Sequence, residues 1–268
     1  MPKSAFKGRV LIVAGSDSGG GAGIQADIKT VSALGGYAAT AITALTAQNT
    51  LGVHGVVGVE PDFIAQQMTV VLEDIGADSI KTGMLHNSAV IEIVSDTLMS
   101  WPDIPVVVDP VMFAKGGHSL LEKEATAALK DRLLPLAQIV TPNIPEAETL
   151  ADMTIKSVAD MKAACKRIEN FGCKAVLLKG GHMDGDRLSD VLYADGVFEI
   201  FESERIKSRH THGTGCTLAS TIAAGLAQGR SLSDSVALGH AFVREAILSA
   251  PEFGAGHGPL NHGHSLKT

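Results

Sequence analysis

The sequence is poor in cysteine, in aromatic residues and in positive charge. Its 268 residues include three cysteines and 4% aromatic residues, and the net charge is -7. Cys165, Cys173 and Cys216 are irregularly spaced, which argues against a disulfide framework, and the acidic balance argues against nucleic acid as a partner. No apolar run reaches the about 20 residues of a membrane span, and no signal segment opens the chain. We therefore expect a soluble, cytoplasmic protein without a membrane partner.

Two common nucleotide-binding motifs are also missing or incomplete. Residues 15–20 supply the glycine frame of a P-loop, but a glycine and an alanine follow where lysine and serine or threonine are required. The segment GAGIQA (21–26) fits the dinucleotide pattern, yet no acid lies between Asp27 and Glu60 to bind a ribose. The remaining readings are a substrate-binding loop, which we favour, and a glycine turn that only packs a helix on a strand. Asp27 either binds a polar ligand or merely favours the helix dipole.

Short apolar runs alternate along the chain with helical patterns, which is typical of a mostly parallel sheet with helices on both faces. We expect one α/β domain over residues 1–268, with ligands bound beyond the carboxyl ends of the strands. Strands are expected at 9–15, 38–49, 78–84, 105–110, 138–143 and 174–182, with a hairpin over 189–203, and residues 53–60 are either a short strand or an excursion of the chain. Helices are expected at 23–34, 61–76, 87–100, 123–137, 144–151, 158–172, 214–228 and 233–249.

A second glycine cluster, HGTGCTLAS, opens one of the last two predicted helices. Gly213 and Gly215 leave the backbone N–H groups of residues 213–216 bare, and these amides with the helix dipole form an anion hole. A thiol in that place, Cys216, is expected to have its pKa lowered to about 3.5–7.5 and to accept a proton from a substrate hydroxyl group. The alternatives are a buried thiol that only packs, or a zinc site with the nearby histidines, which a single cysteine does not favour.

Four polar side chains follow other predicted strands. Asp109 and Lys179 stand at strand ends, and Asn143 and Glu146 are three residues apart on one helical turn. Asn143 and Glu146 could hold Mg²⁺ through water, although Asn143 could equally be only a helix N-cap. With the anion hole, these groups favour ATP-dependent phosphoryl transfer without a P-loop.

The motifs AGSDSGGGAGIQADIKT, ITALTAQNT, TGML, VVVDPVM, TPNIPEAE, VLLKGGH, HTHGTGCTLAS and GHGPLNH occur in order between residues 9 and 262. Together they resemble the hydroxymethylpyrimidine/phosphomethylpyrimidine kinases, thiamine-biosynthesis enzymes of the ribokinase superfamily. The resemblance implies a ribokinase-like three-layer α/β/α fold, with ATP and Mg²⁺ as partners. It implies phosphorylation of 4-amino-5-hydroxymethyl-2-methylpyrimidine and then of its monophosphate to the diphosphate.

The resemblance also implies roles for individual residues. Gln48 would hydrogen-bond the aminopyrimidine, in a pocket with Gly15, Asp27, Met84 and Val111. Mg-ATP would be held by Asn143, Glu146, Lys179 and Thr214, with Glu146 and Asp109 near the metal. The anion hole would be built by Gly213, Thr214, Gly215 and Cys216, with Cys216 as the catalytic base.

Three other functions remain open at this point. A pyridoxal kinase of the same cysteine-bearing branch has a similar hydroxymethylated ring as its substrate. A non-catalytic metabolite-binding protein and a dinucleotide oxidoreductase are less favoured. We also expect a homodimer, and Gly116 and Gly117 suggest a mobile loop or lid.

Overall fold

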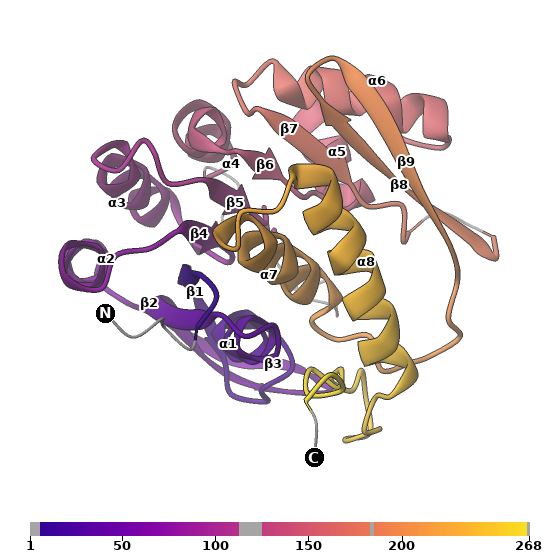
Figure 1. Ribbon diagram of the computed structural model, residues 1–268, viewed down its shortest axis with the longest axis horizontal. Helices are drawn as coiled ribbons and strands as arrows, with labels where there is room; N and C mark the ends of the chain where they lie inside the picture. The colour runs from indigo at the N-terminus through magenta and orange to yellow at the C-terminus, as the bar shows by residue number, and fades with distance from the viewer. Residues whose placement is uncertain (1–5, 113–124, 183–184, 267–268) are drawn as a thin grey trace.

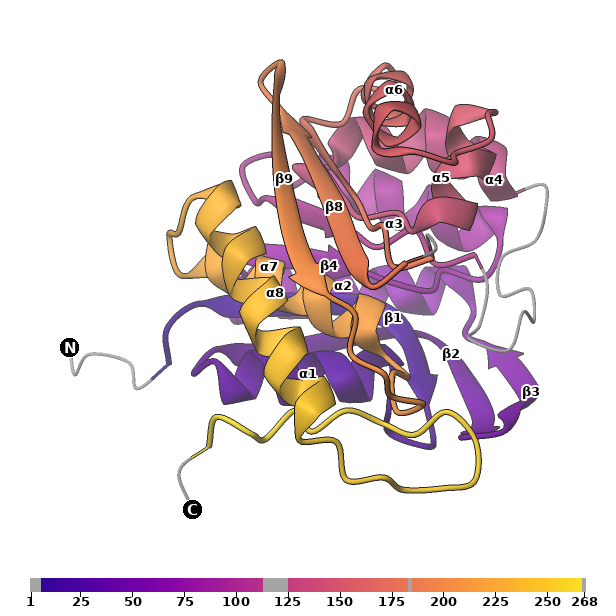
Figure 2. The same ribbon diagram turned by 90° about the vertical axis from the view of Figure 1, so that its right-hand side faces the viewer.

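A computed structural model describes residues 6–112, 125–182 and 185–266. The described residues form a nine-stranded sheet in the order β3-β2-β1-β4-β5-β6-β7-β8-β9, which runs through the molecule in Figures 1 and 2. The strands from β2 to β7 in this order pair in parallel, as the alternating sequence pattern predicts. Their bounds are Arg9–Asp17 for β1, Tyr37–Asn49 for β2, Ser79–Thr82 for β4, Val106–Val108 for β5, Ile139–Val140 for β6 and Ala175–Leu178 for β7.

The central strands are short and buried on both faces, as expected where helices cover a parallel sheet on both sides. One face packs against α1 (Gly23–Ala33), α7 (Thr214–Ala227) and α8 (Leu232–Leu248). The opposite face carries α2 (Pro61–Asp74), α3 (Ser88–Met99), α4 (Ala125–Ala128), α5 (Ile144–Ala151) and α6 (Val158–Glu169). The expected three-layer α/β/α fold is therefore confirmed (Figure 1).

Antiparallel strands extend both ends of the parallel sheet. Strand β3 (Gly52–Gly58) pairs with β2, and β8 (Arg187–Ala194) pairs with both β7 and β9 (Val197–Glu204). The β8–β9 hairpin turns at Asp195 and Gly196, whose positive φ angles of 51° and 76° match the twist of a tight two-residue hairpin. The hairpin predicted from this Asp-Gly pair is confirmed.

The region predicted as one helix over 123–137 is less regular. After α4, the chain continues as a π-helical segment, Leu129–Leu133, and a 3₁₀ turn, Leu134–Leu136. Pro135 lacks a backbone N–H and cannot continue an α-helix, which explains the change to a tighter turn. Residues 123 and 124 and the proposed Gly116–Gly117 loop lie outside the described residues. Within the described part of the chain, no helix has the length and apolar character to cross a membrane.

Candidate active site

A cavity of about 580 Å³ opens at the carboxyl ends of the parallel strands, beside the start of α7. Parallel strands end at one edge of the sheet, so side chains far apart in sequence meet there. All but one of the sequence-predicted site residues line this cavity: Gly15, Gln48, Met84, Asp109, Val111, Asn143, Glu146, Lys179, Gly213, Thr214, Gly215 and Cys216.

Asp27 is the exception, because it does not line the cavity. It lies in the first turns of α1 as expected, but its side chain is fully buried. Its Oδ2 is 2.8 Å from Lys81 Nζ, and its Oδ1 accepts a 2.7 Å hydrogen bond from the Ser220 hydroxyl. The carboxylate is therefore paired with Lys81, and the expectation that Asp27 lines the substrate pocket is not met in this structure.

Lys81 was not predicted as a site residue, although it was visible in the sequence as a charged residue inside the buried strand β4. Its ammonium group reaches the floor of the cavity, with no exposed surface on the side chain. Burial lowers the pKa of a lysine, but Asp27, Cys216 and Asp109 outweigh that effect and the pKa of Lys81 is raised. Burial raises the pKa of Asp27 while Lys81 and Ser220 oppose the rise. At 2.8 Å the opposite charges stabilise each other, and the pair is ionised.

The two glycine clusters of the sequence lie in direct contact. Gly213 has a φ angle of 86°, and a Cβ atom there would stand 1.9 Å from the carbonyl oxygen of Gly21. A Cβ on Gly21 would in turn stand 2.5 Å from Cδ2 of His212. Only glycines allow the β1–α1 loop and the start of α7 to approach so closely.

Cys216 lines the cavity, but its pKa is not lowered as the sequence suggested. Burial raises the pKa of the thiol to about 12, and Asp27 and Asp109 act in the same direction. Lys81 and the Gly23 N–H oppose the rise without cancelling it. The fold adds the charges of two carboxylates, Asp27 and Asp109, that the local sequence around Cys216 does not reveal. In this structure Cys216 is a neutral thiol at pH 7.

An ion pair between Lys179 and Asp109 lies at the start of α7. Lys179 Nζ is 3.1 Å from Asp109 Oδ1, which also accepts a hydrogen bond from Thr141. A Cβ on Gly215 would stand 3.3 Å from Lys179 Nζ, so the missing side chain leaves room between the lysine and the helix terminus. Burial lowers the pKa of Lys179, but Asp109 and Glu146 outweigh it and the pKa is raised. A fixed positive charge therefore stands beside the bare amides of a helix N-terminus, which is the chemistry that holds a phosphate.

Asn143 and Glu146 form a capping box at the start of α5. Asn143 Oδ1 accepts from the Glu146 N–H at 3.0 Å, and Glu146 Oε2 accepts from the Asn143 N–H at 2.8 Å. The N-cap role weighed for Asn143 is confirmed. Both residues nevertheless line the cavity. Burial raises the pKa of Glu146 to about 7, against the lowering effect of Lys179.

The carboxylates of Asp109 and Glu146 fit a magnesium ion held through water. Both face the cavity, and each has an oxygen that the ion pair and the capping box do not use: Oδ2 of Asp109 and Oε1 of Glu146. Hard oxygen ligands of this kind are those that Mg²⁺ prefers, and Mg²⁺ commonly keeps several of its waters.

The opposite end of the cavity is made by β1, β2 and the residues after β4. A Cβ on Gly15 would stand 2.5 Å from the terminal methyl group of Met84, so the glycine lets this methionine lie flat against β1. Gln48 lies at the end of β2, where the β2–β3 pairing is irregular between Ala47 and Gln48. An irregularity of this kind changes the direction of a side chain relative to the alternation of a regular strand. This end of the cavity therefore combines the apolar surface of Gly15 and Met84 with the side-chain amide of Gln48.

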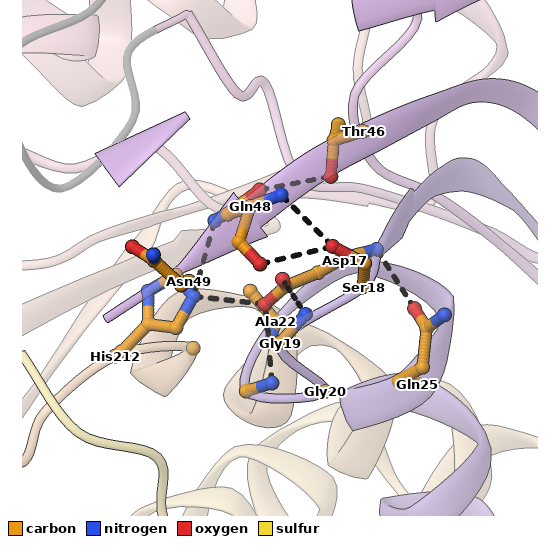
Figure 3. A network of polar contacts seen from close by, with 12 residues as sticks. Asp17, Ser18, Gly19, Gly20, Ala22, Gln25, Thr46, Gln48, Asn49 and His212 are labelled. Carbon is orange, nitrogen blue, oxygen red and sulfur yellow. Dashed lines mark hydrogen bonds and ion pairs between the residues drawn. The ribbon is translucent and has the colours of Figure 1, made fainter. Parts of the chain in front are cut away.

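Two residues missed as ligand-site residues from the sequence surround Gln48. His212 Nε2 lies 3.2 Å from Gln48 Nε2 and 2.9 Å from Asp17 Oδ2 (Figure 3). Asp17 is part of the GSDSGG motif and His212 is part of HTHGTGC, but nothing in the sequence pairs residues so far apart. Only the contact between the two glycine loops brings them together.

Comparison with known proteins agrees with this geometry. Residues 17–261 match the family model described as phosphomethylpyrimidine kinase. The chain is 50% identical over 256 residues to the thiamine biosynthesis bifunctional protein ThiED of Geobacter sulfurreducens, a match that covers 96% of this chain and 52% of that protein. The chain thus spans about half the length of that relative. It is 47% identical over 255 residues to the hydroxymethylpyrimidine/phosphomethylpyrimidine kinase of Bacillus subtilis, covering 95% of this chain and 94% of that protein.

Solved structures give the same result. The Bacillus subtilis pyridoxal kinase, solved as an ADP complex, superposes with a TM-score of 0.90 at 36% identity, over 97% of this chain and 98% of that chain. The phosphomethylpyrimidine kinase of Clostridium difficile 630 gives a TM-score of 0.81 at 42% identity, over 90% and 100%. The fold is that of the ribokinase-like small-molecule kinases. Within that class, this chain belongs to the phosphomethylpyrimidine kinase family.

Proposed function

We propose that the chain transfers the γ-phosphoryl group of ATP to 4-amino-5-hydroxymethyl-2-methylpyrimidine, and then to the monophosphate to give the diphosphate. The observation that carries the proposal is the two-ended cavity. One end has an apolar wall and the Gln48 amide, and the other has Lys179 beside the N-terminus of α7. A small ring with a polar edge fits the first end, and the phosphoryl groups fit the second.

At the ring end, Gln48 binds the aminopyrimidine edge. A side-chain amide offers one acceptor and one donor side by side, and an aminopyrimidine offers the complementary donor and ring nitrogen. Gly15, Met84 and Val111 form the apolar part of this end. Ring binding here directs the hydroxymethyl group toward Cys216 and the start of α7.

At the phosphate end, the first-turn amides of α7 and Lys179 bind the phosphoryl group in transfer. The first N–H groups of a helix have no partner within it, so they are available to oxygens that gain charge in the transition state. Gly213, Thr214 and Gly215 supply this backbone, and Lys179 exchanges part of its contact with Asp109 for the phosphates. Preorganised donors of this kind supply much of the rate enhancement in phosphoryl transfer.

Cys216 serves as a neutral partner of the substrate hydroxyl group. Its raised pKa leaves no resident thiolate at pH 7. A loose phosphoryl-transfer transition state demands little from a base, because bond formation to the attacking oxygen has made little progress. The thiol then orients the hydroxyl group instead of deprotonating it in advance.

Asp109, Glu146 and Asn143 would hold Mg²⁺ through water, and the ion would supply positive charge to neutralise the phosphate oxygens. The capping box keeps the Glu146 carboxylate fixed at the start of α5.

Product analysis tests the proposed reaction directly. The protein is incubated with Mg-ATP and the hydroxymethylpyrimidine, with pyridoxal in a parallel tube, and the products are separated by chromatography. We expect pyrimidine monophosphate followed by diphosphate. Formation of pyridoxal phosphate alone would replace the substrate, and no transfer in either tube would contradict the kinase activity.

Pyridoxal kinase is the second candidate, because the structures with TM-scores of 0.90 bear that name. Pyridoxal also carries a hydroxymethyl group on a nitrogen-containing aromatic ring. Its ring lacks the amino group beside a ring nitrogen that would complement the two-atom edge of Gln48. We therefore expect pyridoxal to react more slowly than the pyrimidine in the parallel assay.

We further propose that the chain is a single domain that forms a homodimer in the cytoplasm. The continuous sheet from β3 to β9 supports one domain. Exposed apolar side chains on β2, on β3 and in the turn between them, Leu45, Val57 and Leu51, support a dimer contact at that edge. Sedimentation analysis of the wild type and of Val57→Asp tests the assembly.

A further inference from the structure

Three segments from distant parts of the chain converge on the side chain of Gln48. Figure 3 shows Asp17 and the β1–α1 loop on one side, His212 from the segment before α7, and Thr46 on β2. All four residues line the cavity. The amide that we assign to pyrimidine binding is therefore enclosed by polar neighbours before any ligand arrives.

The backbone of Gln48 is held by a single hydroxyl group. Ser18 Oγ donates to the Gln48 carbonyl oxygen at 2.9 Å and accepts from the Gln48 N–H at 2.8 Å. These two bonds tie the end of β2 to the β1–α1 loop. What remains free is rotation of the terminal amide, which decides whether its oxygen or its nitrogen faces His212.

Asp17 determines which atom of His212 carries a proton. Its Oδ2 accepts from the N–H groups of Gly21 and Ala22 at 3.1 and 2.8 Å, and its Oδ1 accepts from Gly19 at 2.8 Å. Burial would raise the pKa of Asp17, but the His212 contact and the backbone donors outweigh burial and the pKa is lowered. An ionised carboxylate only accepts hydrogen bonds, so His212 Nε2 must donate across its 2.9 Å contact.

This proton leaves no lone pair on His212 Nε2 for the amide nitrogen of Gln48, which lies 3.2 Å from it. Figure 3 shows this contact as a dashed line. The other end of the amide has the same conflict. Thr46 has one hydroxyl proton, which it donates to the Ser16 carbonyl oxygen at 2.8 Å, while Gln48 Oε1 lies 3.2 Å from that hydroxyl. Turning the amide by 180° removes both conflicts. Oε1 then becomes the second, longer acceptor of the one Nε2–H of His212, which it shares with Asp17 in a bifurcated hydrogen bond, and Nε2 donates to the oxygen of Thr46.

We propose that His212, held by Asp17, fixes the amide of Gln48 with its oxygen toward the imidazole ring, and thereby makes the site specific for an amino edge over an oxo edge. The inference rests on the proposed function, since it assigns the feature of the ring that the same cavity selects. His212 is a positioning residue here, because it acts through Gln48.

The selection follows from the order of donors and acceptors. In its fixed orientation the amide keeps one lone pair on Oε1 and one N–H on Nε2 for a ligand. A 4-aminopyrimidine presents an N–H donor next to a ring nitrogen acceptor, which matches that order. The 4-oxo analogue presents a carbonyl acceptor next to a ring N–H donor, so it opposes acceptor to acceptor and donor to donor. A mismatched site with buried polar groups rejects such an analogue strongly.

The test compares the 4-amino and 4-oxo forms of 5-hydroxymethyl-2-methylpyrimidine on each variant. The readouts are kcat/KM for both forms and binding of both by calorimetry without ATP. The wild type is expected to prefer the amino form by at least about 100-fold. His212→Ala frees the amide to turn, and the preference is expected to fall below about tenfold. The double variant His212→Ala, Thr46→Val also removes the contact between Thr46 and the amide, and it is expected to lower the preference for the amino form further.

Two variants separate positioning from a general loss of structure. His212→Gln keeps an N–H donor near the position of Nε2, and it is expected to restore most of the preference. His54→Ala is the matched control, because His54 is an exposed histidine that contacts Asn49, the neighbour of Gln48. It is expected to leave the preference unchanged. A partly unfolded variant would lose both ligands equally and keep the ratio.

The outcomes distinguish this inference from the proposed function. A wild type that prefers the amino form, with an equal preference in His212→Ala and in the double variant, would overturn the role of His212 alone. A wild type that neither binds nor phosphorylates either pyrimidine would overturn the proposed substrate and this inference together. A wild type that accepts both forms equally would leave the kinase activity standing and exclude a fixed amide.

Discussion

The site contains two lysine–aspartate pairs, which have the same residue types but different surroundings. Lys81 and Asp27 are completely sealed, with no exposed surface on either side chain. Lys179 and Asp109 lie further out, and the Lys179 side chain keeps 14% of its surface exposed. The distances also differ, at 2.8 Å in the sealed pair and 3.1 Å in the open pair.

Only the partly exposed pair, Lys179 and Asp109, is available to a ligand. The sealed pair already has Ser220 as a third partner and leaves no exposed side-chain surface for a ligand, so it serves to fix α1 against β4 and to set the charge at the cavity floor. An accessible pair can exchange partners, because an incoming phosphate replaces the carboxylate next to the lysine. Cys216 interacts electrostatically with both lysines, so the pKa of its thiol is expected to change when either pair is altered.

The largest expected effect is on stability, when the sealed pair is broken. Asp27→Ala leaves a buried, unpaired ammonium group and is expected to lower the free energy of unfolding by about 3–5 kcal/mol. Urea unfolding at pH 7 measures it. The double variant Asp27→Leu, Lys81→Met removes both charges and is expected to be more stable than Asp27→Ala.

The control for this prediction is an exposed pair. Arg187 and Glu202 lie 3.8 Å apart with most of their side-chain surface exposed. Glu202→Ala is expected to change the free energy of unfolding by less than about 1 kcal/mol. An equal effect of Asp27→Ala and Glu202→Ala would contradict the distinction between sealed and exposed pairs.

The open pair is expected to affect catalysis more than stability. Lys179→Met removes a positive charge from the phosphate end, and kcat is expected to fall by roughly 10²–10³. Unfolding by urea is expected to change much less than in Asp27→Ala. Lys174→Met, an exposed lysine just before β7, is the matched control for steady-state assays. Unchanged kcat in Lys179→Met would remove Lys179 from the proposed phosphate site.

The smallest effect concerns the thiol between the two pairs. With a pKa of about 12 for Cys216, the thiolate fraction rises about tenfold per pH unit between pH 7 and 9.5. The rate of alkylation by iodoacetamide is expected to follow that rise without a plateau. Lys81→Met removes a positive charge that favours the Cys216 thiolate, so alkylation is expected to be slower than in the wild type at each pH.

Cys216→Ser serves as the blank in this experiment, because it reports any reaction of the two buried cysteines. A plateau near neutral pH in the wild type would show that the thiol is a resident thiolate. That result would restore Cys216 as a candidate base and would contradict the neutral thiol described above.

Local sequence patterns determined much of this protein. The strand and helix order, the Asp195-Gly196 turn, and the polar residues at the strand ends were all predictable, because they depend on periodicity and turn chemistry within short segments. The site residues after β5, β6 and β7 follow from one rule, since parallel strands deliver their carboxyl ends to one edge.

The tertiary structure alone decided which charges meet. Asp27 was expected to face a ligand, but β4 places Lys81 against it. Cys216 was expected to be partly a thiolate, but burial in the fold and the charges of two carboxylates raise the pKa of its thiol. Asp17 and His212, which are 195 residues apart in the sequence, meet because two glycine loops pack together. Periodicity reports on neighbours along the chain, whereas pKa values and hydrogen-bond directions depend on neighbours in space, and only the folded arrangement supplies those.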